Sequence, residues 1–383
     1  MRLLLVGNYP PDRQQSMQAY ARMLLNGCRR LGIDAELVAP KAVLLAPTKD
    51  PVGIRKWIGY LDKFIIFPLQ LRRMAQCADW THVCDHSNGM YLLWLQGQQC
   101  SITCHDVIAI QAARGALDGW PTSLMGKLLQ KLNLAGVARA RKIVCVSDMT
   151  RRQLVGLRSD IESKTVVVPN ALHSKFAFDP IWRAALKAHF LAWLAQERFF
   201  LHVGSGHPRK NRPAVLHIFS ELRQRATFSD TYLIFVGPPP DDAMRKIMEE
   251  NDLDSRVVIV DDAPLPLLTA LYSGAEALIF PSLNEGFGWP VVEAQACGCP
   301  VFASNLPPMP EVGGKAAVYI DPQDHCQTAE AIANANLDEM RSAGLTNAAR
   351  FQSERMIRDL LSDVFADFSH VEGEGEIAAQ ATR

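Results

Sequence analysis

The segment with the strongest chemical signal is FPSLNEGFGWPVVE, residues 280–293. An apolar strand ends at Pro281, a glycine-rich turn follows, and Pro290 suits the first position of a helix. Gly286 and Gly288 let a ligand approach the backbone closely, and the N–H groups of a helix start attract phosphate. The pattern predicts a phosphate-binding turn.

Two glutamates flank this turn. Glu285 precedes it, and Glu293 follows in what we expect to be the first helical turn, so that both carboxylates face one pocket from opposite sides. Paired carboxylates suit the hydroxyl groups of a sugar and a ribose. The alternative is an ordinary strand, turn and helix in which acidic residues merely favour the helix start.

A second segment, LHVGSGHPRKN at residues 201–211, also lies between an apolar strand and a helical pattern. Its adjacent cations, Arg209 and Lys210, suit a diphosphate that gains negative charge as a bond breaks. The run from Gly204 is similar to a dinucleotide-binding loop, but the third glycine of that fingerprint is absent. A solvated basic turn is the competing interpretation.

Polar clusters follow two strand candidates of the first half: Asp85-His86-Ser87 and His105-Asp106. Either histidine could instead be a satisfied structural residue. We expect no metal site, because no His-x3-His or carboxylate-helix spacing accompanies these residues. A Ser-His-Asp triad is disfavoured, because consecutive residues at one strand end point in opposite directions.

The elements that must position these residues are short apolar strands alternating with helical patterns, which predict parallel sheets wrapped by helices. Strands are expected at residues 2–6, 35–38, 80–84, 101–104, 142–146, 165–168, 199–203, 232–236, 257–260, 277–280 and 301–303. Ser16 is the expected N-cap of the first helix, and Pro213 is expected to start another. Two doubly wound sheets would place the carboxyl ends of their strands around a shared cleft.

The overall composition fits a two-domain globular protein. The chain has 383 residues, of which 48% are hydrophobic and 21% charged. Its nine cysteines include no CxxC pair, which favours reduced, buried thiols over disulfides or a zinc site. The apolar run at residues 1–7 is too short for a signal peptide, and no stretch is long enough to span a membrane. We therefore expect a cytoplasmic protein.

The net charge of zero hides an asymmetry. Residues 1–185 carry 24 Lys and Arg against 13 Asp and Glu, whereas residues 186–383 carry 16 against 27. The basic half is expected to face an anionic surface or substrate. Within it, residues 53–74 interleave basic and aromatic side chains, which suits either an anionic membrane surface or, more commonly, helices with a buried aromatic stripe.

Taken together, the EGFG turn, the following EAQACGCPV run and the Arg-Lys pair resemble the retaining glycosyltransferases of family 4. The resemblance implies a GT-B fold, in which two Rossmann-like α/β domains face a cleft and a C-terminal helix crosses back to the first domain. It implies an acceptor-side domain over 1–180, a nucleotide-sugar-binding domain over 181–350, a crossing helix over 351–369 and a disordered tail over 370–383.

The resemblance also implies roles for individual residues. The catalytic group would be His105, Arg209, Lys210 and Glu285; the donor-binding group Gly204, Ser205, Gly237, Asp261, Gly286, Phe287, Gly288, Trp289 and Glu293; and the acceptor-side group Ser16, Met17, His86 and Asp106. Two departures from the family pattern matter. Ser205 occupies a place that is often basic, so Arg209 is expected to substitute, and residues 12–17 lack the usual Gly-Gly pair, which alters the acceptor pocket.

The implied reaction moves a hexose from a UDP- or GDP-linked donor to a hydroxyl group with retained anomeric configuration, without a metal or other cofactor. The acceptor would be a glycan, a glycolipid or a small molecule, and no nucleic acid is expected. The basic domain could contact the inner face of a membrane. The alternatives are a sugar-nucleotide epimerase or a phosphorylase on the same fold, or a non-catalytic nucleotide-sugar-binding protein.

Overall fold

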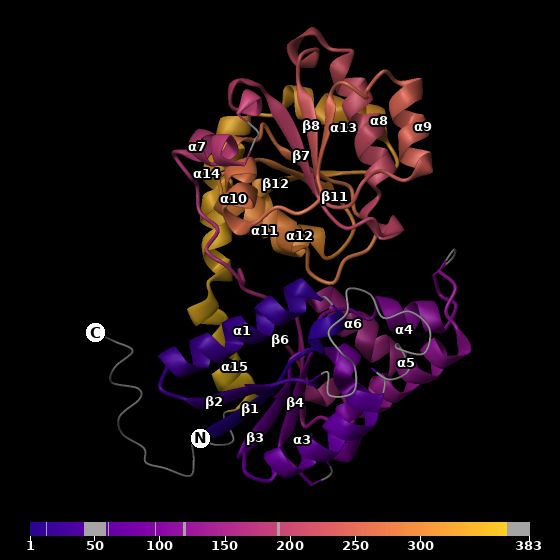
Figure 1. The fold of residues 1–383 in the computed structure, drawn as a ribbon, viewed down its shortest axis with the longest axis vertical. Coiled ribbons are helices and arrows are strands. Elements are labelled where there is room, and N and C mark those ends of the chain that lie inside the picture. The colour runs from indigo at the N-terminus through magenta and orange to yellow at the C-terminus, as the bar shows by residue number, and fades with distance from the viewer. Residues whose placement is uncertain are drawn as a thin grey trace. The chain divides into compact units, whose positions relative to one another are not determined.

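The computed structural model describes residues 1–12, 14–41, 59, 61–95, 97–117, 120–189 and 192–365. They form two compact units, which Figure 1 colours from indigo to yellow along the chain. Unit 1 contains residues 1–173 together with the described chain from 353 onward, and unit 2 contains residues 174–352. Each unit is built on one six-stranded sheet in which all strand pairs are parallel.

The sheet of unit 1 has the strand order β2-β1-β3-β4-β5-β6. Its strands are β1 (Arg2–Val6), β2 (Asp34–Val38), β3 (Trp80–Val83), β4 (Cys100–Cys104), β5 (Lys142–Cys145) and β6 (Thr165–Val167). The direction of winding reverses between β1 and β3, and ligands of such folds bind beyond the carboxyl ends of the strands at that point.

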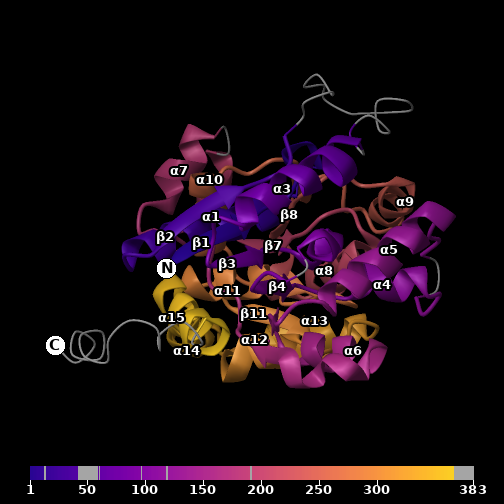
Figure 2. The same cartoon turned by 90° about the horizontal axis from the view of Figure 1, so that it is seen from below.

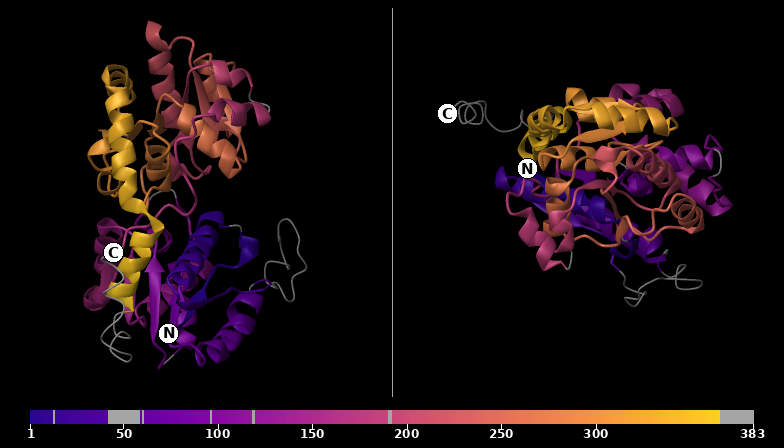
Figure 3. Two further views of the ribbon diagram at one scale, coloured as in Figure 1. Left: turned by 90° about the vertical axis from the view of Figure 1, so that its left-hand side faces the viewer. Right: turned by 90° about the horizontal axis from the view of Figure 1, so that it is seen from above.

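Alternate residues of the unit 1 strands face opposite helical layers. One face, which includes Leu4, Val6 and Ile102, packs against a layer of helices: α3 (Phe67–Ala75), the 3-10 helix η3 (His86–Trp94), α4 (Ile108–Ala113), α5 (Leu124–Val137) and α6 (Asp148–Leu157). The other face is covered by α1 (Gln15–Arg30) and the C-terminal α15 (Ser353–Val364), which contact each other. Figure 3 shows α15 in yellow beside the indigo and purple elements of unit 1.

The sheet of unit 2 has the order β12-β11-β10-β7-β8-β9. Its strands are β7 (Phe199–Val203), β8 (Tyr232–Val236), β9 (Val257–Val260), β10 (Leu278–Phe280), β11 (Val301–Ser304) and β12 (Ala317–Ile320). Counted from β7, this is the doubly wound order 3-2-1-4-5-6 of dinucleotide-binding folds, and its reversal lies between β7 and β10.

Eight α-helices in the described part of unit 2 surround this sheet, and they are labelled in Figures 1 and 2. They are α7 (Trp182–Ala188), α8 (Arg212–Arg223), α9 (Asp242–Glu250), α10 (Leu265–Gly274), α11 (Trp289–Ala296), α12 (Met309–Gly313), α13 (His325–Asn334) and α14 (Leu337–Ala348). The core between α8, α9, α13 and the sheet is almost entirely aliphatic and aromatic, with Phe200, Phe219 and Phe235 fully buried.

Eleven of the twelve strands lie within a residue or two of their predicted positions. The prediction missed β12 (Ala317–Ile320), a half-buried strand at the edge of the sheet. The predicted N-cap was wrong: Gln14 caps α1 without a side-chain hydrogen bond, and Ser16 lies inside the helix with its side chain exposed. The helix placed near the C-terminus ends at Val364, and residues 370–383 lie outside the described residues.

Three further expectations concern the bulk of the chain. All nine cysteines are free thiols, and seven of them are buried. Within residues 53–74, Phe67 and Leu71 belong to the unit 1 core, as a buried stripe requires, while Trp57 and Tyr60 lie outside the described residues. None of the described helices is both long enough and apolar enough to cross a bilayer.

Candidate functional site

The two segments with the strongest chemical signal meet at the winding reversal of unit 2. Arg209 and Lys210 follow β7, and Glu285 follows β10. Glu285 accepts a hydrogen bond from each cation, one per carboxylate oxygen: Arg209 Nη1 to Oε2 and Lys210 Nζ to Oε1, both at 2.5 Å. Residues that lie 75 positions apart in sequence thus form one charged cluster at the position where such folds bind ligands.

Backbone contacts fix the two loops to each other. The N–H of Leu283 donates to the carbonyl of Arg209 at 2.7 Å, and Arg209 Nη1 donates to the carbonyl of Asn284 at 3.1 Å. Asn211 adopts the left-handed conformation with φ 51°, which Asn tolerates better than most residues. Its side-chain amide donates to the carbonyls of Pro281 and Pro322. The cations are therefore held between two loops that are hydrogen-bonded to each other.

The cluster is largely withdrawn from water, since the side chains of Lys210 and Glu285 are 9% and 8% exposed. Burial disfavours the ionised form of Glu285, but the charges of Lys210 and Arg209 outweigh it and lower the carboxyl pKa. Burial also lowers the pKa of Lys210, and Glu285 opposes part of that effect. The Lys210 ammonium lies 4.9 Å from the centre of the Phe280 ring, which favours the charged form.

Three glycines let the surrounding loops approach closely. A Cβ at Gly237, which follows β8 with φ 143°, would lie 2.1 Å from the carbonyl oxygen of Gly204. A Cβ at Gly204 would touch the Lys210 side-chain stem, and Gly288 has φ 101° with Met309 beside it. The glycines at these strand ends thus serve close packing as well as any access for a ligand.

Gly237→Ala tests this packing. We expect the variant to lose about 2 kcal/mol or more of stability, because the methyl group must displace the Gly204 backbone and the φ value disfavours an L side chain. Thermal unfolding should show a lower transition temperature for unit 2, which contains Gly237. Gly156→Ala on α6, where a Cβ meets nothing within 4 Å, is the matched control and should keep or slightly raise the transition, because alanine favours a helix over glycine.

The donor-side candidates Gly286, Phe287 and Glu293 are buried, but they differ in what they contact. Glu293 is the fifth residue of α11, so it lies in the second helical turn and not in the first, and it accepts a hydrogen bond from Tyr272 Oη at 2.9 Å. Phe287 is buried against the rings of Trp289 and Phe351, which is a packing role. Gly286 is buried in the same turn.

Two more candidates are exposed at the carboxyl end of the sheet. Ser205 follows β7 by two residues, and Asp261 directly follows β9. Both side chains face solvent. Since β9 is the edge strand of the sheet, Asp261 lies two strands from the cation cluster, which follows β7.

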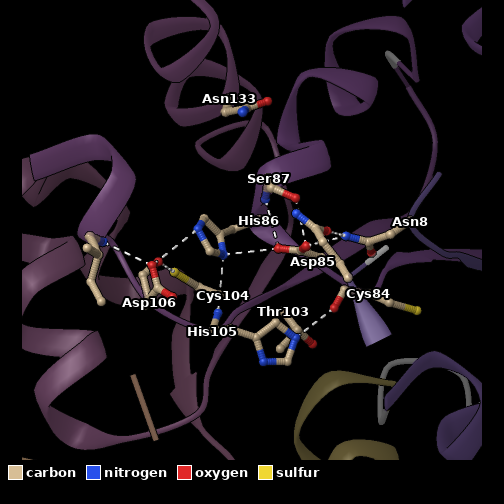
Figure 4. A network of polar contacts seen from close by, with 12 residues as sticks. Asn8, Cys84, Asp85, His86, Ser87, Thr103, Cys104, His105, Asp106 and Asn133 are labelled. Atoms are coloured by element: carbon tan, nitrogen blue, oxygen red, sulfur yellow. Dashed lines mark hydrogen bonds and ion pairs between the residues drawn. The ribbon is translucent and has the colours of Figure 1, made fainter. Parts of the chain in front are cut away.

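Unit 1 carries a second polar network at its own winding reversal (Figure 4). Asp85 follows β3 and accepts hydrogen bonds from Asn8 Nδ2 at 2.5 Å, from the Ser87 N–H at 2.9 Å and from Ser87 Oγ at 2.6 Å. His86 Nδ1 lies 3.2 Å from Asp85 Oδ1. The network therefore joins the ends of β1 and β3 around one carboxylate whose side chain is only 3% exposed.

His86 lies between two carboxylates. Its Nε2 is 3.8 Å from Asp106 Oδ1, and Asp106 also accepts a hydrogen bond from the Ile108 N–H at the start of α4. Burial disfavours an imidazolium, but Asp85 and then Asp106 outweigh it and raise the pKa of His86. Burial likewise disfavours ionised Asp85, and the contact with His86 reverses this and lowers the carboxyl pKa. The two carboxylates thus favour the protonated form of His86.

His105 is the neighbouring histidine, and its pKa shifts in the opposite direction to that of His86. Burial lowers its pKa, so the ring is neutral near pH 7. Its Nε2 faces the carbonyl oxygen of Cys84 at 2.9 Å, and its ring packs edge-on against Tyr20. The N–H of His105 points at His86 Nδ1 at 3.4 Å, so the two histidines are adjacent. Of the acceptor-side candidates, His86 and Asp106 belong to this network, whereas Ser16 and the half-buried Met17 lie on α1.

Sequence reasoning missed Asn8 and Tyr272, which contact Asp85 and Glu293, and Asn211, which joins the loop after β7 to Pro281. Asn8 lies two residues after β1, at the strand end where the topology concentrates polar groups, so its position carried a signal. Tyr272 lies on α10 in an apolar helical pattern, and nothing in that pattern indicates its hydrogen bond to Glu293. Among the described residues, no three His, Cys, Asp or Glu side chains are grouped to hold a metal ion.

The fold and this site define a doubly wound α/β protein with a charged Arg-Lys-Glu cluster between two loops of unit 2. Comparison with known families gives the same result. Residues 17–175 match the model of Glycosyltransferase Family 4, and residues 189–352 match that of Glycosyl transferases group 1. The chain belongs to this family of GT-B glycosyltransferases, and its general function is glycosyl transfer.

Individual relatives agree with this assignment. The chain is 28% identical over 270 residues to the O-antigen chain mannosyltransferase RfbU of Salmonella typhimurium, covering 70% of this chain and 68% of that protein. It is 31% identical over 193 residues to O-antigen chain mannosyltransferase B of Escherichia coli, covering 48% and 49%. The matched region thus spans about half the length of the second relative.

Solved structures show the same fold. The HepE protein of Anabaena, in complex with UDP and glucose, superposes with a TM-score of 0.73 at 12% identity, covering 96% of this chain and 100% of that one. A sucrose-phosphate synthase of Thermosynechococcus elongatus gives a TM-score of 0.71 at 17% identity, covering 97% and 100%. These similarities confirm the predicted two-domain GT-B fold.

Proposed function

We propose that this glycosyltransferase moves a hexose from a nucleotide-diphosphate sugar, UDP- or GDP-linked, to a hydroxyl group of a glycan, glycolipid or small-molecule acceptor, with retention of anomeric configuration. Relatives named as mannosyltransferases of O-antigen chains support mannose as the sugar and a polysaccharide as the product. Neighbouring structures that contain UDP or UDP-glucose support a nucleotide-sugar donor.

The cation cluster of unit 2 is the observation that carries the proposal. Arg209 and Lys210 share one carboxylate, so the three groups together keep one positive charge in a poorly solvated place. An additional anion is the usual partner of such a group. Arginine has five N–H donors and lysine three, and Glu285 uses only part of this set. A diphosphate fits the remaining donors and the charge.

The bond changes of the proposed transfer are simple. The acceptor oxygen bonds to the anomeric carbon on the face from which the diphosphate departs, as the bond between that carbon and the phosphate oxygen breaks. The departing phosphate accepts the proton of the acceptor hydroxyl group, so the protein supplies no nucleophile. Arg209 and Lys210 stabilise the charge that develops on the phosphate, which is the largest single contribution in reactions of this type. We propose that this positive charge replaces that of a metal ion, and that no other cofactor takes part.

The remaining roles follow from where the residues lie. Glu285, held between the two cations, and the backbone of Gly286 to Gly288 would orient the sugar. Glu293 would hold the ribose, with Tyr272 fixing its carboxylate. We propose that unit 2 binds the donor and unit 1 the acceptor, and that His105, held by the Cys84 carbonyl, supports the sugar near the reacting carbon.

A donor screen tests the proposal. Purified protein is mixed with UDP, GDP, ADP and their hexose conjugates, and the thermal transition is followed. A true donor present at 100 times its Kd should stabilise the folded protein by about 2.7 kcal/mol. If no sugar nucleotide shifts the transition, the proposed function is wrong.

The identified donor then separates the alternatives. Incubation with candidate acceptors, with and without EDTA, should give a product whose anomeric configuration by NMR equals that of the donor. Conversion of the nucleotide sugar without an acceptor would indicate an epimerase, dependence on inorganic phosphate a phosphorylase, and binding without turnover a sensor. An inverted product, or loss of the rate in EDTA, would contradict the corresponding part of the proposal.

A further inference from the structure

One helical layer of unit 1 exposes an unusual number of large apolar side chains. Seven residues of this layer are between 38% and 86% exposed, and we call them the apolar face: Leu61, Ile65, Leu69, Trp94, Leu124, Met125 and Leu128. Elsewhere among the described residues of unit 1, only Met1 and Leu31 are large, apolar and exposed. The concentration in one layer distinguishes this face from the scattered apolar residues of an ordinary surface.

The apolar face belongs to neighbouring elements. Leu61, Ile65 and Leu69 lie on α3 and the helical turns before it, Trp94 ends η3, and the others begin α5. Both α3 and α5 contact η3, and all three pack on the same side of the sheet through the unit 1 core. Figures 1 and 2 show α3 and α5 among the helices that cover unit 1.

The spacing of the apolar face is that of helix stripes that point away from the core. On α5, Leu124, Lys127, Leu128 and Lys131 follow the i, i+3, i+4, i+7 pattern of one helix side and are all exposed. On α3 and the helical turn before it, Ile65, Leu69, Arg72 and Arg73 follow a similar spacing. The opposite side of each helix, with Phe67, Leu71 and Leu134, lies in the core.

The exposed charges of α3 and α5 have one sign. Four exposed basic residues lie on α3 and α5, namely Arg72, Arg73, Lys127 and Lys131. The sequences of α3, η3 and α5 contain no Asp or Glu. Leucines interleaved with lysines and arginines, without acidic residues, are typical of helices that lie in the interface of an anionic bilayer. Protein interfaces are instead depleted in lysine.

We propose that the apolar face docks on the surface of an anionic phospholipid bilayer. The leucines and Trp94 enter the boundary between head groups and acyl chains, and the four basic side chains lie at the level of the lipid phosphates. This inference goes beyond glycosyl transfer and does not depend on the identity of the donor. It would place unit 1, which we propose binds the acceptor, on the membrane.

Vesicle binding by the full chain tests this. The protein is sedimented with vesicles of phosphatidylcholine alone or of phosphatidylcholine and phosphatidylglycerol in a three-to-one ratio. We expect binding to the mixed vesicles that weakens with added salt, and much less binding to the neutral ones. L124Q/L128Q should bind the mixed vesicles at least about tenfold more weakly than the wild type does. In K127Q/K131Q, the loss of each lysine should weaken binding at low salt by about fivefold.

The matched control is Leu345→Gln on α14 of unit 2, another exposed helical leucine, which should bind vesicles like the wild type. All variants should keep the thermal shift that a nucleoside diphosphate gives to the wild type, which separates this test from that of the donor. The inference is overturned if the wild type ignores mixed vesicles at low salt, or if L124Q/L128Q binds them unchanged. Self-association or a protein complex that depends on Leu124, without vesicle binding, would assign the face to a protein partner.

Discussion

Lys210→Ala should lower kcat by about 100- to 1,000-fold with the identified donor, which is the range expected when one group that stabilises transition-state charge is removed. The Lys210 ammonium contacts Glu285 at 2.5 Å in the cluster that we assign to the diphosphate. Steady-state kinetics measure the effect, and the KM for the donor should change much less than kcat, because the charge develops as the bond breaks.

The fold should survive this substitution, because Glu285 keeps Arg209 as an ion-pair partner. Circular dichroism and an unchanged gel-filtration volume verify it. Lys246→Ala on α9, where the side chain is largely exposed, is the matched control and should have wild-type kinetics. A kcat for Lys210→Ala within threefold of the wild type would remove Lys210 from the mechanism.

Asp85→Asn should cost about 3–5 kcal/mol of unit 1 stability, the range for breaking a buried ion pair at one partner. Asp85 accepts from Asn8, from both donors of Ser87 and from His86. The amide of asparagine offers these donors only one oxygen. Its NH₂ group is itself a donor and would face them in place of the second carboxylate oxygen. Hydrogen exchange of β3 and η3 amides measures the loss in unit 1 separately from unit 2.

The effect of Asp85→Asn should also depend on pH. The pKa of His86 is raised in the folded state, so its contribution is complete below about 6.5 and is lost as the pH rises through the raised value. The pKa of Asp85 is lowered, so its contribution is present above about 3.8 and is lost only in strong acid. The difference between wild type and variant should therefore be larger at pH 6 than at pH 9. Asp160→Asn, in an exposed ion pair, should leave exchange unchanged at both values.

Most of the fold could be predicted because parallel strands buried on both faces are continuous apolar runs between turn residues. Ile143 and Phe280 lie in such runs and are fully buried. The edge strand β12 lies in the apolar run from Ala316 to Ile320 and was overlooked, although its sequence carries the same signal. The start of α1 was misplaced because serine is the better N-cap by preference, whereas here the loop from β1 delivers Gln14 to that position.

The candidate site was predictable to a similar degree. Arg209, Lys210 and Glu285 were identified because glycine-rich turns after two strands imply neighbouring strand ends in a doubly wound sheet. Their contact depends on the order β10-β7, which brings the two loops together and which no local pattern encodes. Tyr272 could not be found in this way, because hydrogen bonds across elements leave no spacing in the sequence, whereas the place of Asn8 after β1 carried a signal that was overlooked.

The central claim is that Arg209 and Lys210 bind the diphosphate of the donor. Isothermal titration of the wild type and of R209Q/K210Q with UDP, UMP, GDP and GMP tests it most directly. We predict that the wild type binds one diphosphate at least about tenfold more tightly than its monophosphate, as two charge-assisted contacts to the outer phosphate would give. The double variant should lose that preference. Equal affinity of the wild type for mono- and diphosphate, or an unchanged preference in the double variant, would contradict the account.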